Sequence, residues 1–479
     1  MENTKLTQIL KTLSKDEFNE LEKFIISPFF NTSNRISKFF LRLKKNYPDF
    51  ESDSLSKENV FKEAYPGEPF KDKKVRDLMS RLLKLTEDFL AYKDINNHPL
   101  LMKRHTLLQL AERNLPKHFD KKSGEIKKYL DERKIKNNDF LYFNYLLSKD
   151  IRNYYETKKS TGKRIEFFHA ISKEINLFTD YFIMKILKYY VFLINHEKTL
   201  NFKFDADFLD EIIHYVQRQD KTKIPSMQAF YYIVLINKNL NDNDSFYKLK
   251  KLLAENDGAM EKDDLVLAYM QLYNFTKLKS LSEDIEFRKE NFEIIKELVA
   301  RKFYPLEDGY INDNTYMTFA GEGLIQGDLK WSEKFINGHK NLLNPEVREN
   351  VYTYSASILN YRKGNYDAAL NGLAKVSIED FYYHIRVKNH VLRIYYELGD
   401  FENALSVLDS FKHFLSGGKL IPEYVRIRFV NFANFLSRLI NSRLNNDNEN
   451  IIKIRHEISE SKQLENRNWL LDRINELNL

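Results

Sequence analysis

The chain of 479 residues carries 76 Lys and Arg against 69 Asp and Glu, a formal net charge of +7. It contains no cysteine, which excludes disulfides, thiolate metal sites and cysteine nucleophiles. No apolar stretch reaches the roughly 18 uncharged residues that a membrane span needs, and the first residues lack the apolar core of a signal peptide. We therefore expect a cytoplasmic protein without a membrane segment.

Helices are expected throughout the chain. The 14 glycines and 10 prolines are too few for the tight turns of a strand-rich fold of this length. Long runs with apolar residues at helical spacing predict an all-α protein. A single core does not usually grow to this length, whereas stacked helix pairs can, because each pair contacts only its neighbours.

Residues 1–95 are predicted to form an N-terminal helical module. Ser14 and Glu17 have the spacing of a capping box in front of an apolar-periodic stretch, which indicates the start of a helix. A Pro-Gly turn precedes a long helix predicted over 71–92, with its apolar residues on one side. The sequence Asn-Asn-His-Pro at 96–99 is the predicted boundary of this module.

Residues 100–302 are predicted to form an irregular array of helices joined by short polar loops. Short joins between helices are typical of antiparallel neighbours. The helices expected in this region cover residues 100–114, 124–134, 140–158, 165–177, 181–196, 207–217, 226–239 and 245–254. Loops are expected at 257–264 and 305–313.

The last part of the chain, residues 314–479, contains an internal repeat. The phrase Gly-Asn-Tyr-Asp-Ala-Ala-Leu at 364–370 recurs as Gly-Asp-Phe-Glu-Asn-Ala-Leu at 399–405, and a third turn has Gly-Asp at 327–328. Glycine permits the left-handed turn that ends one helix, and the Asn or Asp beside it caps the next. The helices expected here cover residues 316–326, 329–343, 351–363, 366–376, 382–398, 401–415, 422–444, 450–461 and 469–477.

The repeated residues resemble the tetratricopeptide repeat, a helix-turn-helix unit of 34 residues, and the resemblance is concentrated in residues 315–416. Positions of the family's turn glycine, aromatic residue and packing alanine are occupied by Gly364, Tyr366 and Ala369, by Gly399, Phe401 and Ala404, and by Gly327, Leu329 and Ser332. The family's early tryptophan and closing proline are replaced. The resemblance implies a right-handed α-solenoid of antiparallel helical hairpins, with a concave groove lined by the first helix of each unit.

Members of that family mostly bind proteins or peptides in this groove, which implies a non-enzymatic scaffold. Aligned on the repeat, the side chains implied to face the groove are Tyr354, Ile358, Tyr361, Arg362, Arg386, Asn389, Arg393 and Tyr396. Aromatic residues and arginine are common in binding hot spots, and Arg386, Asn389 and Arg393 can hold a carboxylate of an acidic partner segment through charge-assisted hydrogen bonds. The alternative is that these are ordinary solvated residues of a helix surface.

Signatures of enzyme chemistry are not found in the sequence. Ser160-Thr161-Gly162-Lys163 is similar to the end of a phosphate-binding loop, but the leading glycine is missing and Arg164 replaces the metal-binding hydroxyl. The histidines lack metal-ligand spacing, and there is no nucleophile elbow or dinucleotide-binding fingerprint. We therefore expect no catalytic residues, no cofactor and no metal ion.

A DNA-binding transcriptional regulator is the alternative hypothesis. Residues 56–90 contain two predicted helices around a Pro-Gly turn, and the second helix is rich in Lys and Arg. This layout is similar to the winged-helix heads of some bacterial regulators with helical-repeat bodies. The turn is long for that motif, acidic residues share the second helix, and no hairpin wing is predicted to follow.

Overall fold

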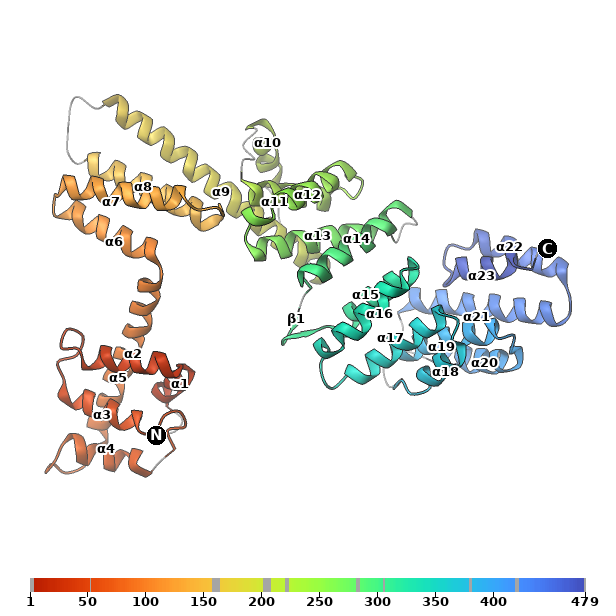
Figure 1. Cartoon of the computed structure of the whole chain (residues 1–479), viewed down its shortest axis with the longest axis horizontal. Coiled ribbons are helices and arrows are strands. Elements are labelled where there is room, and N and C mark those ends of the chain that lie inside the picture. Colours follow the sequence, from red (N-terminus) through yellow and green to blue (C-terminus); the bar gives the residue numbers. More distant parts are fainter. Residues whose placement is uncertain are drawn as a thin grey trace. The chain divides into compact units, whose positions relative to one another are not determined.

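The computed structural model of this protein describes residues 4–51, 53–156, 164–200, 208–219, 224–280, 285–304, 306–378, 381–417 and 422–477. Over these ranges the chain forms 23 α-helices and one short two-stranded sheet, which confirms the all-α prediction (Figure 1). None of the described helices is long and apolar enough to cross a membrane. The contacts divide the chain into two compact units, one with Met1–Phe192, Asp205–Met227 and Gly258–Met260, the other with Leu193–Phe204, Gln228–Asp257 and Glu261–Leu479. The three domains expected at 1–95, 100–302 and 314–479 stay a prediction.

The N-terminal helices of the first unit share one continuous apolar core. They are α1 (Lys5–Thr12), α2 (Lys15–Ile26), α3 (Asn34–Lys44), α4 (Lys57–Ala64) and α5 (Asp72–Asn97), with a 3-10 turn η1 (Asp53–Leu55). The core includes Leu10, Leu21, Phe40 and Leu82, each fully buried. The predicted capping box is confirmed, because Ser14 Oγ accepts a hydrogen bond from the backbone of Glu17, whose side chain accepts one from Ser14 in return.

The rest of the first unit departs from the sequence prediction at two places. Its helices are α6 (Pro99–Glu112), α7 (Pro116–Asp131), α8 (Asn138–Glu156), α9 (Arg164–Leu200) and α10 (Leu209–Gln219), although α9 continues into the second unit. Helix α7 begins at Pro116 and runs through Gly124, because proline suits a first helical position and one glycine costs only about 1 kcal/mol. The two helices predicted at 165–177 and 181–196 are one, since no proline or glycine separates them. The predicted basic turn Ser160–Lys163 lies outside the described residues.

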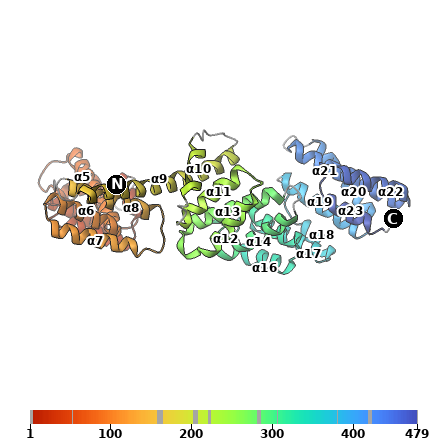
Figure 2. The same cartoon turned by 90° about the horizontal axis from the view of Figure 1, so that it is seen from above.

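The remaining helices are α11 to α23, and from α12 onward each packs on the next, for example α13 on α14 and α17 on α18. Their bounds are α11 (Pro225–Lys238), α12 (Asn243–Glu255), η2 (Asp257–Ala259), α13 (Lys262–Ser280), α14 (Ile285–Arg301), α15 (Asp313–Ile325), α16 (Leu329–His339), η3 (Lys340–Leu342), α17 (Arg348–Arg362), α18 (Tyr366–Leu373), α19 (Phe381–Glu397), α20 (Phe401–Gly417), α21 (Glu423–Leu444), α22 (Asn448–Glu460) and α23 (Arg467–Asn475). Helices α20 to α23 lie close together in both views (Figure 1 and Figure 2). They share one apolar core.

The repeated glycines adopt one backbone conformation. Gly327, Gly364 and Gly399 have φ of 80°, 79° and 70°, and the N–H after each bonds to a carbonyl five residues back, at 2.9–3.0 Å. The same turn occurs without glycine at Asn446, with φ 52°, where Asp447 donates to the Ser442 carbonyl at 2.8 Å, and outside the repeat region at Asn114 and Lys302. Asparagine tolerates this conformation, so the turn at Asn446 keeps the geometry without the glycine.

Small residues lie at the contacts of the helix pairs. Ser332, Ala369 and Ala404, which take the packing position in the sequence alignment, are all 0% exposed. Their small size allows the two helices of a pair to approach closely.

The expected loop at 305–313 is partly wrong: β1 (Leu306–Glu307) pairs antiparallel with β2 (Tyr310–Ile311). The Asp-Gly turn between them has positive φ at both residues, as tight hairpins require.

Candidate partner-binding surfaces

The side chains predicted to bind a partner lie on α17 and α19, and four of them are buried within the protein itself. The buried four are Tyr354 at 7%, Tyr361 at 6%, Asn389 at 6% and Tyr396 at 4% exposure. As placed, these four do not line an open groove, because they offer almost no surface to a partner. The side chains that keep exposed area are Ile358, Arg362, Arg386 and Arg393.

Aromatic packing between α17 and α19 explains the burial of Tyr354. Its ring meets Tyr383 and His390 edge-on, with centroids 6.1 and 5.9 Å apart, and its hydroxyl lies 3.5 Å from His390 Nδ1. Tyr361 is 6.2 Å from the same imidazole. The tyrosine rings of α17 therefore pack against α19, whereas the sequence predicted that they face an open groove.

The last helix, α23, covers the remaining two buried positions. Asn466, just before α23, donates to Asn389 Oδ1 at 2.6 Å. Trp469 packs edge-on against Tyr396 at 5.3 Å and donates from Nε1 to Glu397 Oε1 at 2.8 Å. The closing helix was expected from sequence at 469–477, but its return to α19 was not.

An ion pair strengthens this attachment of α23. Arg473 binds Glu397 Oε2 at 2.6 Å, with the two side chains only 21% and 12% exposed. Because both charges are largely removed from water, their attraction is less screened than that of a surface pair. Glu397 is thus occupied by groups of α23 and does not neutralise the arginines on α17 and α19.

Within the part of the chain that the structure describes, the partners found for Arg362, Arg386 and Arg393 are neutral. Arg362 donates to the backbone carbonyl of Leu324 at 2.8 Å, and Arg386 donates to Asn314 Oδ1 at 2.8 Å. Arg393 donates to the Oδ1 of the asparagine before α23 at 3.1 Å and lies over the Tyr361 ring, 4.8 Å from its centroid. Among the described residues, no ion pair joins any of the three to a carboxylate.

His390 feels the positive charges of all three arginines. Burial, together with the positive charges of Arg393, Arg386 and Arg362, lowers the pKa of His390 to about 3, against a hydrogen bond to the Arg386 carbonyl that raises it. The His390 imidazole packs against the rings of Tyr354 and Tyr361, while other atoms of His390 are exposed. Three guanidinium groups close enough to act on one imidazole make this region positive and favour an anion there.

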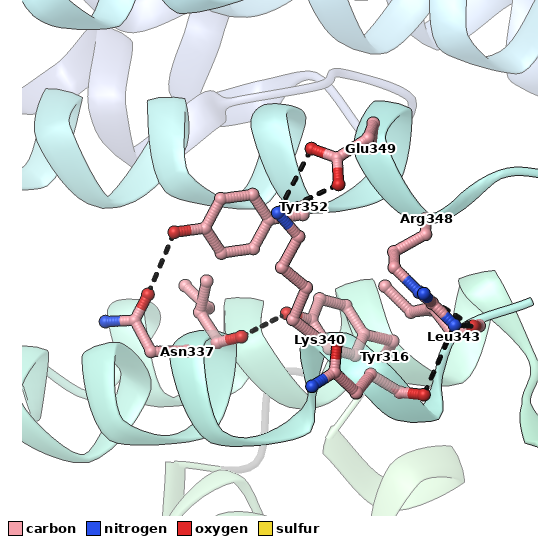
Figure 3. A network of polar contacts seen from close by, with 9 residues as sticks. Tyr316, Asn337, Lys340, Leu343, Arg348, Glu349 and Tyr352 are labelled. Carbon is pink, nitrogen blue, oxygen red and sulfur yellow. Dashed lines mark hydrogen bonds and ion pairs between the residues drawn. The ribbon is translucent and has the colours of Figure 1, made fainter. Parts of the chain in front are cut away.

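Contacts around η3 fix α17 against α16 and thereby hold the first of the arginine-bearing helices in place (Figure 3). Arg348 donates to the backbone carbonyl of Leu343 at 3.0 Å. Lys340 pairs with Glu349 at 2.9 Å, and its ammonium lies 4.2 Å from the centroid of the Tyr352 ring. The turn between the two helices is therefore tied to α17 through backbone, charge and ring contacts together.

Sequence analysis missed a second surface, at the ends of α2 and α5. A hollow of about 410 Å³, here named the aromatic hollow, is lined by Glu20, Lys23, Phe24, Ser27, Phe30, Phe89, Tyr92, Lys93, Asn96 and Asn97. Next to it, Phe29 is 86% exposed. The signal in the sequence is the pair of phenylalanines directly after Pro28, because apolar residues in a turn have no helical face to bury them.

The basic residues behind the DNA-binding hypothesis lie on α5 without a uniform positive face. Lys73, Arg81 and Lys84 are exposed, and so is Asp77 between them. Arg76 pairs with a carboxylate of its own helix at 2.8 Å. Helix α6 follows α5 after a single residue, so no strand hairpin stands where a wing would. The hypothesis of a DNA-binding regulator stays a prediction.

Comparison of the chain with protein-family models, with curated proteins and with solved structures gives no match. Within the ranges that the structure describes, no three His, Asp or Glu side chains are grouped as metal ligands.

Proposed function

We propose that the protein is a non-enzymatic helical-repeat scaffold that binds an acidic segment of a protein partner at Arg362, Arg386 and Arg393. In this proposal the pairs from α15 to α22 form a right-handed solenoid of antiparallel hairpins similar to tetratricopeptide repeats. The observation that supports the binding role is that the three arginines, on α17 and α19 around Tyr361 and His390, have only neutral partners among the described residues.

Physical chemistry favours an anionic ligand at this place. A guanidinium carries five N–H donors, and the neutral acceptors found for each arginine use only part of them. A carboxylate of the partner adds charge-assisted hydrogen bonds, each worth about 1.5–3 kcal/mol, and the planar fork of arginine suits two-point binding. The partner's charge also offsets the mutual repulsion of the three cations.

The partner is proposed to bind beside α23 and not in its place. Leu470 and Ile474 of α23 are 0% and 2% exposed, and exposing two such side chains costs about 3–6 kcal/mol. A few charge-assisted bonds at the arginines do not clearly exceed that cost. The exposed sides of Arg362, Arg386 and Arg393 are reachable with α23 in position.

Fluorescence anisotropy with a labelled glutamate-rich peptide tests the proposal. Arg386→Gln/Arg393→Gln should weaken binding at least tenfold, since each lost charged hydrogen bond is worth about 1.4 kcal/mol or more. The control is Arg426→Gln, which removes one positive charge, half of the change in the double variant, at an arginine of α21 paired with Glu423. Thermal melts show whether each variant is folded.

Binding should also weaken as salt is raised, because exposed charges are screened. Equal affinity of the double variant and the wild type, or an equal loss in Arg426→Gln, would contradict the proposal. Capture of partners from cell extract with the same three proteins extends the test to natural ligands. The proteins that depend on Arg386 and Arg393 should carry acidic segments.

A further inference from the structure

Phe29 is held outward as an apolar knob on the N-terminal module. Its exposed fraction, 86%, is the highest among the described large apolar side chains. The turn that carries it is rigid, because Phe30 and Asn31 donate from their backbone N–H to the Ser27 carbonyl at 3.1 and 3.0 Å. The Asn31 side chain in turn donates to the Ile25 carbonyl at 2.9 Å. Because hydrogen bonds already hold the backbone that carries this exposed ring, less order has to be gained when the ring binds a partner.

The aromatic hollow lies directly beside this knob. Phe29 meets Phe30 edge-on at 4.9 Å, and Phe30, which lines the hollow, stacks on Phe24 at 3.8 Å and meets Tyr92 at 5.6 Å. The hollow measures about 410 Å³, within the size range of pockets that hold ligands larger than one ring. Phe29 of the same chain does not line it. One small patch thus carries both a protruding ring and the open aromatic hollow.

The rim of the hollow carries both signs of charge. Lys93 pairs with Glu20 at 2.8 Å, and Glu20 is still 54% exposed. Lys23 is exposed and has no ion pair among the described residues. A rim with both charges is complementary to itself when two copies meet about a two-fold axis, whereas a rim of one sign would repel its own copy.

We infer that two copies of this chain bind each other through this patch, with Phe29 of each copy inserted in the aromatic hollow of the other. A knob and a hole on one patch satisfy the requirement of a two-fold interface, in which the same surface serves both partners. The two inserted rings would be the anchors of the contact. The inference is independent of the proposed peptide site, which lies on other helices.

Sedimentation equilibrium of the full chain over micromolar concentrations tests the inference. The wild type should be a dimer. Loss of each of the two inserted Phe29 rings should weaken the dimer about 30-fold, so Phe29→Ala should raise the dissociation constant about a thousandfold. The control is Phe70→Ala, which removes a 46% exposed phenylalanine of the same module outside the hollow. That variant should stay dimeric.

A mixing experiment separates self-recognition from a general loss of stability. Asn96→Trp should fill the hollow and leave the knob, whereas Phe29→Ala removes the knob and leaves the hollow. Each variant alone should be monomeric, and the mixture should form a heterodimer with one of the two knob contacts restored. A monomeric wild type overturns the inference. The aromatic hollow would then be a site for a side chain of a different protein. A dimer that Phe29→Ala does not weaken, or a mixture without heterodimer, overturns it as well.

Discussion

Two glycines of α15, only two residues apart, should respond in opposite ways to replacement by alanine. Gly321 has open space where a Cβ would stand. At Gly323 a Cβ would lie 2.3 Å from Ser332 Oγ and 2.9 Å from Trp331 Cε3 of α16. The backbone of α15 therefore lies directly against side chains of α16 at Gly323, but not at Gly321.

The magnitude follows from two opposing terms. Alanine in place of glycine inside a helix stabilises by about 0.8–1.0 kcal/mol, and Gly321→Ala should show this gain. Overpacking costs about 1–3 kcal/mol, and the neighbours of Gly323 cannot easily yield. The Trp331 ring is stacked on Phe335 at 5.4 Å and meets Phe292 at 5.1 Å, while Ser332 is 0% exposed. The free energies of unfolding of the two variants should differ by about 1–3 kcal/mol, with Gly321→Ala the more stable.

Urea unfolding followed by tryptophan fluorescence measures this difference. The chain has two tryptophans, and replacing Trp469 by Phe in all proteins leaves Trp331 as the reporter at the contact itself. If Gly323→Ala is as stable as Gly321→Ala, the two helices do not approach as closely as described, and the account of small residues at the pair contacts fails.

Three further predictions concern the C-terminal helices. Ala404→Glu should cost on the order of 3 kcal/mol or more, because it buries an unpaired carboxylate, whereas Ser406→Glu on the exposed side should melt like the wild type. His390 has a pKa lowered to about 3 from 6.5, so the unfolded chain takes up a proton that the folded protein does not. Stability should therefore fall as pH drops below about 6.5, by about 1 kcal/mol near pH 5.5, and His390→Gln should flatten this dependence in melts at several pH values. Glu397→Gln leaves Arg473 without its counter-charge, so hydrogen exchange in α23 should accelerate; unchanged exchange would show that the ion pair does not hold the helix.

Local signals in the sequence were sufficient for most helix ends in the repeat region. The turn at Gly364 and its copies depends on residues within one or two helical turns of the glycine, and such short-range patterns are visible in the sequence. The packing alanines Ala369 and Ala404 follow for the same reason, since their place is set by distance from that turn. The break between the helices predicted at 422–444 and 450–461 was expected, but its likeness to the glycine turns was not, because asparagine carries a weaker signal for this turn than glycine.

The sequence by itself thus determined an all-helical chain and the placement of its repeated turns. Only the tertiary structure decided which side chains of α17 and α19 remain exposed, because that depends on segments far away in the chain. Asn389 is covered by Asn466, 77 residues later, and Trp469 comes back to Tyr396 and Glu397. The same holds for the aromatic hollow, which forms where α5 passes the end of α2. Periodicity shows which face of a helix is apolar, but it does not show which distant helix will cover it.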